Sequence, residues 1–274
     1  MKAKQALIWG ANELRDFDNP RLEVEVLLMH ALGWDRMALY LNLDNEVSMG
    51  QYQELVKRRK AHAPSAYLTG QREFCGFEFE VNPAVLIPRP STESLVYRAV
   101  ELIKQCGDKT IYDIGTGSGN IAISIAKLIP EAKVIASDID EPSLNLAQHN
   151  AVSLGVDDRV RFLKSNLADH IDHAELIVAN LPYVPHSFEV TPEVAQEPRP
   201  AIFDEADDGL GFYRRLFQNP VFNQRVRYVL IELRPEQYPT MAGWLVQRYP
   251  KVKTQPIRNI DQEIWGLEAD FRVL

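Results

Sequence analysis

A glycine-rich stretch, residues 113–120 (Asp-Ile-Gly-Thr-Gly-Ser-Gly-Asn), most constrains the fold of this chain. Residues 110–112 (Thr-Ile-Tyr) lead into it, and residues 121–126 (Ile-Ala-Ile-Ser-Ile-Ala) follow it. This order predicts a buried strand, a tight turn and the start of a helix, where a ligand can approach the backbone and its unpaired N–H groups. Such turns bind dinucleotides or S-adenosylmethionine, and the stretch alone does not separate the two.

The next predicted strand, residues 133–138, ends in the carboxylate of Asp138. Asp138 lies 19 residues beyond Gly119, about where an acidic residue that binds a ribose is expected. The alternative is that Asp138 caps the helix that Pro142 opens, but Asp140 is better placed for that role. We therefore predict that Asp138 binds the ribose of the cofactor.

A third feature favours a methyl donor over a nicotinamide. The apolar residues 176–179 predict a strand that runs into Asn180, Leu181, Pro182 and Tyr183. Asn-x-Pro-Tyr at the end of the fourth strand is similar to the acceptor-site motif of methyltransferases that modify planar nitrogens, and dinucleotide-binding folds do not need it. An ordinary turn is the alternative. Together the three features favour S-adenosylmethionine.

The composition argues against some classes of function. The chain has 274 residues, of which 46% are hydrophobic and 25% charged, as is ordinary for a soluble globular protein. Its formal net charge of −8 argues against bulk binding of nucleic-acid phosphates. One basic cluster, residues 57–60 (Lys-Arg-Arg-Lys), is interpreted as a solvated helix face rather than a nucleic-acid contact.

The cysteines and the N-terminus indicate a cytoplasmic protein. Cys75 and Cys106 are far apart, and we expect reduced thiols. Residues 1–5 lead into no long apolar run, so we expect no signal peptide, and no stretch approaches the roughly 18 apolar residues of a membrane helix. His170 and His173 lie in a polar connection, and we expect no metal there.

Residues 1–70 are predicted to form a small helical N-terminal domain. Apolar residues within 22–32 predict a helix that ends at Gly33, and Ser48 is a suitable N-cap for a later helix. The domain carries no nucleophile arrangement, metal set or glycine loop. We expect it to recognise a partner or to cover the site.

Residues 71–90 are predicted to be a β-hairpin that links two domains. Apolar residues alternate loosely over 74–81, residues 82–83 (Asn-Pro) mark a turn, and residues 85–87 (Val-Leu-Ile) predict a second short strand.

Arg89 follows this stretch, between Pro88 and Pro90, which hold the chain extended. Thr92 is then a suitable cap for a helix over residues 95–102. We predict that Arg89 lies near the mouth of the site, with an ordinary surface arginine as the alternative.

Strands and helices alternate through the last predicted domain, residues 91–274. The predicted strands lie near 109–114, 133–138, 159–164, 174–180, 226–232, 251–257 and 268–273, and the helices near 119–129, 142–154, 208–218 and 236–248. This alternation predicts an α/β fold with a mostly parallel sheet and helices on both faces. Asp113, Asp138, Asn166 and Asn180 fall at or just past strand ends, where such sheets bind ligands.

Residues 184–209 form a long connection, rich in Pro and Glu, directly after the predicted acceptor motif. Long loops inside compact domains are usually functional, so we expect this one to form a wall of the substrate pocket. A disordered surface excursion is the alternative.

Several stretches that are unspecific alone occur together along the chain. They are residues 66–76 (Ala-Tyr-Leu-Thr-Gly-Gln-Arg-Glu-Phe-Cys-Gly), 85–93 (Val-Leu-Ile-Pro-Arg-Pro-Ser-Thr-Glu), 113–119, 197–201 (Glu-Pro-Arg-Pro-Ala), 208–210 (Asp-Gly-Leu) and 213–216 (Tyr-Arg-Arg-Leu). Over residues from about 20 to about 245 the chain resembles the release-factor glutamine N5-methyltransferase family (HemK/PrmC type).

The resemblance implies a class I methyltransferase domain with a seven-stranded sheet, behind a helical N-terminal domain. The implied cofactor is S-adenosylmethionine, and the implied partner is a peptide-chain release factor, methylated on the side-chain nitrogen of the glutamine in its Gly-Gly-Gln motif. We expect a cytoplasmic monomer. The cofactor-binding residues are expected to be Gly115, Thr116, Gly117, Ser118, Gly119, Asp138, Asn166, Leu167 and Asn180. The catalytic and substrate-binding residues are expected to be Asn180, Leu181, Pro182 and Tyr183, with Arg89 and Glu197 at the substrate.

Three stretches depart from the family pattern. Leu181 replaces the first proline of Asn-Pro-Pro-Tyr, Asn166 and Leu167 stand where the family tends to have Asp and an aromatic residue, and residues 259–274 match poorly. Asn-Leu-Pro-Tyr also occurs in ribosomal-RNA adenine dimethyltransferases. The alternatives are therefore an N6-adenine methyltransferase acting on ribosomal RNA or DNA, a glutamine methyltransferase acting on a ribosomal protein, and a cofactor-binding module without turnover.

The motif also predicts a mechanism. An amide nitrogen is a poor nucleophile, so the site must align it with the methyl group. We predict that the Asn180 side-chain carbonyl and the Leu181 backbone carbonyl accept the two amide hydrogens, that Pro182 fixes the turn and that the Tyr183 ring packs on the amide. No general base is needed, because the methylated nitrogen is acidic enough to lose its proton to water.

Overall fold

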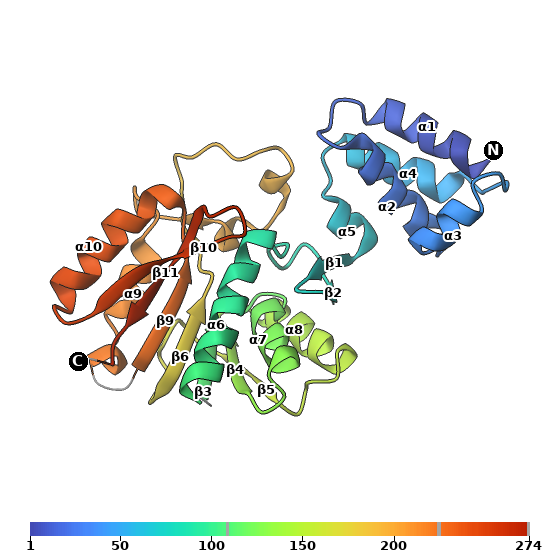
Figure 1. The fold of residues 1–274 in the computed structure, drawn as a ribbon. Coiled ribbons are helices and arrows are strands. Elements are labelled where there is room, and N and C mark those ends of the chain that lie inside the picture. Colours follow the sequence, from blue (N-terminus) through green and yellow to red (C-terminus); the bar gives the residue numbers. More distant parts are fainter. Residues whose placement is uncertain (108–109, 224–225, 273–274) are drawn as a thin grey trace. The chain divides into compact units, whose positions relative to one another are not determined.

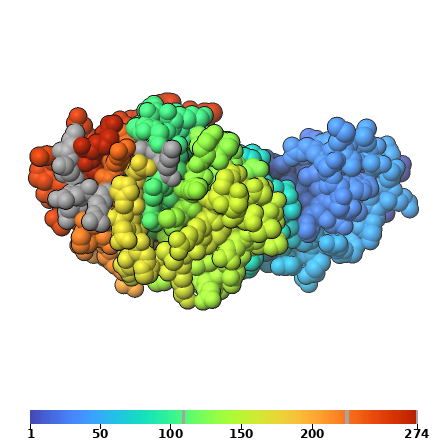
Figure 2. Space-filling model, turned by 90° about the horizontal axis from the view of Figure 1, so that it is seen from below, coloured from blue at the N-terminus to red at the C-terminus, as the bar shows by residue number. Residues whose placement is uncertain are grey.

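The computed structural model describes residues 1–107, 110–223 and 226–272, which divide into two compact units (Figure 1). The helical unit comprises Met1–Gln71 and Val190–Gln196, and the sheet unit comprises Arg72–Glu189 and Glu197–Leu274. In Figure 2 the first of these units takes the blue colours, apart from residues 190–196, and the second runs from teal to red. Each unit has a hydrophobic core of its own.

The helical unit contains five helices. They are α1 (Ala3–Glu13), α2 (Pro20–Leu32), α3 (Arg36–Leu41), α4 (Gly50–Lys60) and α5 (Ser65–Thr69). The Asn19 side chain caps α2 through the Leu22 amide, and the helix ends at Gly33 with a φ of 64°, as predicted. The N-cap of α4 is Met49, so the prediction of Ser48 was wrong by one residue.

Arg59 is the exception to the interpretation of residues 57–60 as a solvated helix face, since the other three residues are exposed. Its side chain is buried, and its guanidinium donates to both carboxylate oxygens of Glu23 at 2.9 Å and to Glu193 at 2.7 Å. The Gln196 side chain donates to the Ala61 carbonyl at 3.0 Å. The segment Val190–Gln196 therefore packs within the helical unit, although it comes from the long loop at 184–209.

The sheet unit is built on seven strands in the order β10-β11-β9-β6-β3-β4-β5. Their bounds are β3 Thr110–Ile114, β4 Lys133–Asp138, β5 Val160–Lys164, β6 Ala174–Ala179, β9 Val226–Glu232, β10 Lys253–Arg258 and β11 Ile264–Asp270. The five strands from β9 to β5 are parallel, and β11 pairs antiparallel with β9 and β10. The predicted seven-stranded, mostly parallel sheet is confirmed.

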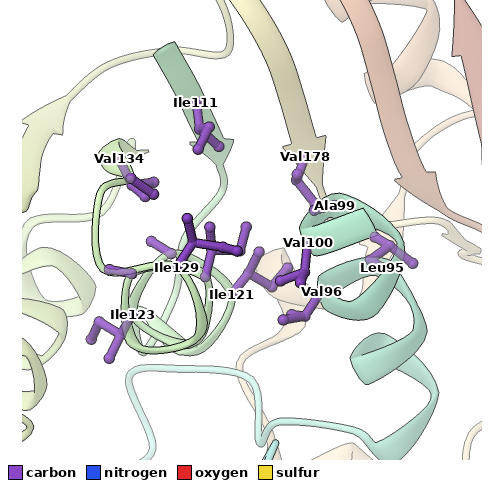
Figure 3. Close-up of a cluster of buried hydrophobic side chains, with 14 of the residues drawn as sticks. Leu95, Val96, Ala99, Val100, Ile111, Ile121, Ile123, Ile129, Val134 and Val178 are labelled. Carbon is purple, nitrogen blue, oxygen red and sulfur yellow. The ribbon is translucent and has the colours of Figure 1, made fainter. Parts of the chain in front are cut away.

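Helices cover both faces of this sheet. One face carries α6 (Glu93–Cys106), α7 (Asn120–Leu128) and α8 (Glu141–Ser153), and the other carries α9 (Gly211–Phe217) and α10 (Tyr238–Arg248). Strand residues alternate between the two cores: Ile111 and Val178 face the first helices, as Figure 3 shows, whereas Tyr112 and Ile177 face the second. Both faces are buried, as a parallel sheet requires.

The last predicted strand was misplaced. β11 begins at Ile264 rather than near 268, because Gly266 weakens the strand signal of residues that nevertheless pair with β9. The predicted strand ends at 109 and 273 lie outside the described residues.

The linker hairpin differs from its prediction as well. Strand β1 (Gln71–Phe74) pairs with β2 (Phe77–Glu80), and Cys75 and Gly76 between them both have positive φ, at 53° and 79°. A two-residue hairpin turn of this kind needs two positive φ angles. The second strand predicted at 85–87 is wrong: the chain turns after β2, where the Val85 amide donates to the Asn82 carbonyl at 3.1 Å.

The long loop at 184–209 is ordered in short pieces. Val184–Pro185 (β7) pairs with Phe203–Asp204 (β8), and single 3₁₀ turns cover Val194–Gln196 and Arg199–Ala201. The alternative prediction, a disordered surface excursion over residues 184–209, is therefore wrong.

No membrane crossing is built into the described part of the chain. Over residues 1–107, 110–223 and 226–272, the helices lack the combined length and hydrophobicity that spanning a bilayer requires.

Gly10 in α1 provides a test of packing in the helical unit. A Cβ atom there would lie 2.1 Å from the Tyr52 hydroxyl and 2.9 Å from a methyl group of Val24, and both neighbours are fully buried. We expect Gly10→Ala to destabilise the protein by about 1–3 kcal/mol, because the buried neighbours have no room to move. Gly50→Ala in α4, where nothing lies within 4 Å, is the matched control and should be neutral or stabilising. Denaturant unfolding measures both; equal stabilities would contradict the packing argument.

Candidate active site

A cavity of about 720 Å³ lies at the carboxyl ends of β3, β4 and β6. This is the position where open α/β sheets bind ligands, beside the strand at which the strand order reverses. Most of the predicted site residues come together in its lining: Arg89, Gly115, Thr116, Gly117, Ser118, Asp138, Asn166, Leu167, Asn180, Leu181 and Pro182. Three predicted residues, Gly119, Tyr183 and Glu197, do not line it.

The Asp113 side chain holds the glycine loop in place. Asp113 is the penultimate of the five residues that form β3. Its Oδ2 accepts hydrogen bonds from the Thr116 hydroxyl at 2.6 Å and from the Ala122 amide at 3.1 Å. The loop is thereby tied to the first turn of α7. Burial raises the pKa of this carboxyl to about 7, and its Oδ1 has no hydrogen-bond partner among the described residues.

Gly115 is needed for a close approach. Its φ is +74°, and a Cβ atom there would lie 2.9 Å from Cδ2 of Leu181. The Leu181 side chain thus packs against the glycine loop and is buried. Leu181, which replaces a proline of the family motif, is therefore well packed.

The sequence left two roles, helix capping and ribose binding, to Asp138 and Asp140, and the structure assigns capping to Asp140. The Asp140 carboxylate caps α8 through the Ser143 amide at 2.9 Å, as predicted. Asp138 accepts the Gly117 amide on Oδ2 at 2.9 Å and the Asp140 amide on Oδ1 at 3.0 Å. An ionised carboxylate has about four acceptor positions, so each oxygen keeps one for a ligand hydroxyl.

The acceptor loop starts at the end of β6 and is held by three side chains from other elements. The Asn180 amide nitrogen donates to the Thr92 hydroxyl at 3.1 Å, and no described residue donates to its Oδ1. The Leu181 amide donates to the Tyr213 hydroxyl at 3.2 Å. The Tyr183 carbonyl accepts from the Gln237 side chain at 2.8 Å. The loop backbone is therefore rigid although one proline of the family motif is replaced.

Gly209 lies so close to the Tyr183 backbone that only glycine fits there. A Cβ atom there would lie 2.1 Å from the Tyr183 carbonyl oxygen, and the residue has a φ of +70°. The chain before α9 passes against the acceptor loop at this point.

Tyr183 and Glu197 are bound to protein groups rather than presented to the cavity. The Tyr183 hydroxyl donates to Glu232 at 2.9 Å, and burial raises the phenol pKa well above its ordinary value, so it stays a donor. Glu197 is buried, accepts the Ile87 amide at 2.9 Å and forms an ion pair with Arg89. Glu197 thus holds Arg89, which does line the cavity as predicted.

Sequence reasoning gave no site role to four residues that shape the site. Thr92 was considered only as a cap, Tyr213 only within the stretch 213–216 that carries the resemblance, and Gln237 and Glu232 were not singled out. Glu232 carried a usable signal, since it ends β9 as Asp138 ends β4. It is fully buried, and burial raises its carboxyl pKa to about 7. Thr92 stands at the start of α6, but its hydroxyl accepts from Asn180 rather than capping the helix.

Comparisons with known proteins decide the family. Residues 5–70 match the model of the PrmC N-terminal domain, and residues 90–184 match that of ribosomal protein L11 methyltransferase (PrmA). The release factor glutamine methyltransferase of Moorella thermoacetica is 41% identical over 206 residues, which cover 73% of this chain and 72% of that one. That of Geobacter sulfurreducens is 37% identical and covers 88% and 87%. This chain belongs to the release factor glutamine methyltransferase family.

Solved structures agree on the fold of this family member. The catalytic domain of human METTL16, in complex with MAT2A 3′UTR hairpin 6, superposes with a TM-score of 0.61 at 18% identity, over 78% of this chain and 83% of that one. The predicted family and class I methyltransferase fold are confirmed, and with the family its cofactor, S-adenosylmethionine.

The cavity suits that cofactor. Its volume lies within the range of about 300–1,000 Å³ that small-molecule sites occupy. Each carboxylate oxygen of Asp138 keeps an acceptor position for a ligand hydroxyl, and Asn166 and Leu167 also line the cavity. The glycine loop leaves backbone space for the amino-acid end.

Asp138 gives a prediction for cofactor binding. We expect Asp138→Ala to weaken S-adenosylmethionine binding by about tenfold to a hundredfold, since two hydrogen bonds to a charged acceptor are lost. Glu141→Gln is the control, because this exposed carboxylate at the start of α8 pairs with no cation of the described residues other than Lys164. Calorimetric titration with the cofactor measures both; unchanged affinity in Asp138→Ala would refute the ribose contact.

Asp113 and Glu232 predict how stability depends on pH. Their pKa values of about 7 in the folded protein exceed the values of about 4 in an unfolded chain. The folded state therefore holds more protons between these values, and its free energy of unfolding falls as the pH rises from about 4 to about 7. Denaturant unfolding of the cofactor-free protein measures this slope. Glu232→Gln removes one of the two groups and should flatten it; a slope that stays the same would contradict the raised pKa.

Proposed function

We propose that this protein transfers the methyl group of S-adenosylmethionine to the side-chain nitrogen of the glutamine in the Gly-Gly-Gln motif of peptide-chain release factors. The observation that carries the proposal is the Asn180 carboxamide. Its nitrogen is bound to Thr92, and its oxygen lacks a donor among the described residues at a lining position of the cavity. Family membership supports the choice of substrate.

Two carbonyl groups receive the substrate amide in this proposal. The first is Asn180 Oδ1, and the second is the backbone carbonyl of Leu181. The Tyr213 hydroxyl lies 3.4 Å from that carbonyl but gives its single hydrogen to the closer Glu232 carbonyl, so the Leu181 oxygen keeps its acceptor capacity. When both N–H bonds of the substrate amide are held by these acceptors, the lone pair of its nitrogen points in one direction, toward the methyl group.

The carbonyls also favour the reaction electrostatically. S-adenosylmethionine, when bound, supplies a methyl group on a positively charged sulfur. As the nitrogen becomes positive in the transition state, oxygen acceptors on its hydrogens stabilise it more than in the ground state. Alignment in a fixed site contributes several kcal/mol more, by the magnitudes typical of positioned reactants, and the methylated nitrogen then loses its proton to water.

The remaining predicted residues receive roles as part of the proposal. Residues 115–119, Asp138, Asn166 and Leu167 hold the cofactor, and Pro182 shapes the turn. Tyr183 and Glu197, which are bound to Glu232 and Arg89, support the walls of the substrate site. Pro198, Pro200 and Ala201 of the long loop supply one of those walls.

The adenine amino group is the competing acceptor, since it is also planar with two N–H bonds and Asn-Leu-Pro-Tyr suits it. The net charge of −8 argues against it, because nucleic-acid affinity comes mainly from cationic side chains on phosphates. A ribosomal-protein glutamine is the other alternative. We further propose that the enzyme works as a cytoplasmic monomer, consistent with its unpaired cysteines.

Methyl transfer from labelled S-adenosylmethionine to a purified release factor tests the function. We expect label on the wild-type factor and none on a factor with Gln→Ala in its Gly-Gly-Gln loop. Asn180→Ala in the enzyme should lower turnover by about a hundredfold or more, because one of two positioned acceptors is lost, while cofactor binding stays. Label on ribosomal RNA or on a ribosomal protein, with none on the release factor, would replace this proposal with the matching alternative.

A further inference from the structure

Two buried side chains lie near Asn180: Thr92, which also lines the cavity, and Glu232, which does not. Thr92 is 1% exposed, and its hydroxyl accepts the Asn180 amide nitrogen at 3.1 Å. Glu232 is 0% exposed, and the hydroxyl of Ser91, the residue directly before Thr92, lies 3.5 Å from its Oε1. The three residues come from β9, from the start of α6 and from the end of β6, so only the tertiary structure brings them together.

Asn180 poses a problem of orientation. The oxygen and nitrogen ends of a carboxamide have nearly the same shape, so packing does not decide which end faces a cavity, and hydrogen bonds must. A threonine hydroxyl alone does not decide either, because it can donate to the oxygen end or accept from the nitrogen end. With the nitrogen end toward the substrate amide, two N–H groups would oppose each other.

Glu232 removes this ambiguity. An ionised carboxylate only accepts hydrogen bonds. Its Oε1 already accepts the Tyr183 hydroxyl at 2.9 Å and the Ser91 hydroxyl at 3.5 Å, while Oε2 is buried without a hydrogen-bond partner among the described residues. A buried oxygen without a donor is costly, and the Thr92 hydroxyl, next to Ser91 in the chain, is the donor that we assign to it; the same hydroxyl counteracts the rise of the Glu232 pKa. With its one hydrogen given to Glu232, Thr92 can only accept from Asn180.

We propose that Thr92 and Glu232 are positioning residues that fix the Asn180 carboxamide with its oxygen toward the substrate amide. The relay runs from the Asn180 N–H to the Thr92 oxygen and from the Thr92 O–H to the Glu232 carboxylate. This inference rests on the proposed function, because it assigns an orientation that methylation of a planar N–H group needs. It also accounts for a charged side chain buried away from the cavity, which burial penalises unless it is hydrogen-bonded.

A matched pair of Thr92 variants tests the relay. Thr92→Val keeps the shape of the side chain and removes the hydroxyl, whereas Thr92→Ser keeps the hydroxyl. On the alkaline side of neutral, we expect Thr92→Val to lower kcat for release-factor methylation by about tenfold to a hundredfold, as lost transition-state hydrogen bonds do, with KM and cofactor affinity within about threefold. Thr92→Ser should stay within about threefold of wild type. Equal losses in both variants, or full activity in Thr92→Val, would overturn the relay.

Glu232→Gln separates the relay from a merely structural role. If Glu232 acts through Thr92, the double variant Thr92→Val/Glu232→Gln loses no more kcat than the worse single variant. Two independent structural effects would instead multiply, and that result would overturn the relay.

The relay can also be tested by NMR without any methyl acceptor, so that this test does not depend on the substrate of the enzyme. In ¹⁵N-labelled protein, the carboxamide signals of Asn180, identified by their loss in Asn180→Ala, should shift in Thr92→Val and Glu232→Gln and return close to the wild-type position in Thr92→Ser. Unmoved signals overturn the relay. Failure of the wild-type enzyme to label a release factor would overturn the proposed function alone.

Discussion

Carboxylates at the ends of three parallel strands hold the loops from which this site is made. Asp113 is the penultimate residue of β3 and holds the glycine loop. Asp138 ends β4 and accepts the Gly117 amide, and Glu232 ends β9 and accepts the Tyr183 hydroxyl of the acceptor loop. Burial of these groups is unfavourable for their charged forms and raises the pKa of each. Backbone amides and hydroxyls from the loops compensate part of this penalty, so the loops and the carboxylates keep each other in place.

The acceptor loop shows how a rigid turn survives a substitution within its motif. Leu181 lacks the ring of the proline it replaces, but its amide is bound by Tyr213 and its side chain packs on Gly115. Gln237 bridges the Tyr183 and Asp208 carbonyls, each at 2.8 Å. In the family motif a proline ring makes this turn rigid. Here Tyr213, Gln237 and Gly115, which are distant in sequence, hold it instead.

The helical unit is organised around another buried charge. Arg59 is enclosed by Glu23 and Glu193, and the Ser65 hydroxyl also donates to Glu23. The favourable geometry of paired charges offsets their desolvation only when several hydrogen bonds are made, as they are here. Through Glu193 and Gln196 the unit includes part of the loop that directly follows the acceptor motif.

The sequence by itself determined the fold class and most of the strands and helices, because hydrophobic periodicity and glycine turns are local. Most of the residues that it predicted for the site do line the cavity, because strand ends converge on one edge of the sheet. It misplaced Ser48 as a cap, residues 85–87 as a strand and the start of β11, where pairing with distant residues outweighs local preference. Only the tertiary structure decided that Glu197 holds Arg89, that the Tyr183 hydroxyl binds Glu232, and that Thr92 binds Asn180. These partners lie about 50 to 140 residues apart in the chain, and a hydrogen bond between them leaves no local pattern to find.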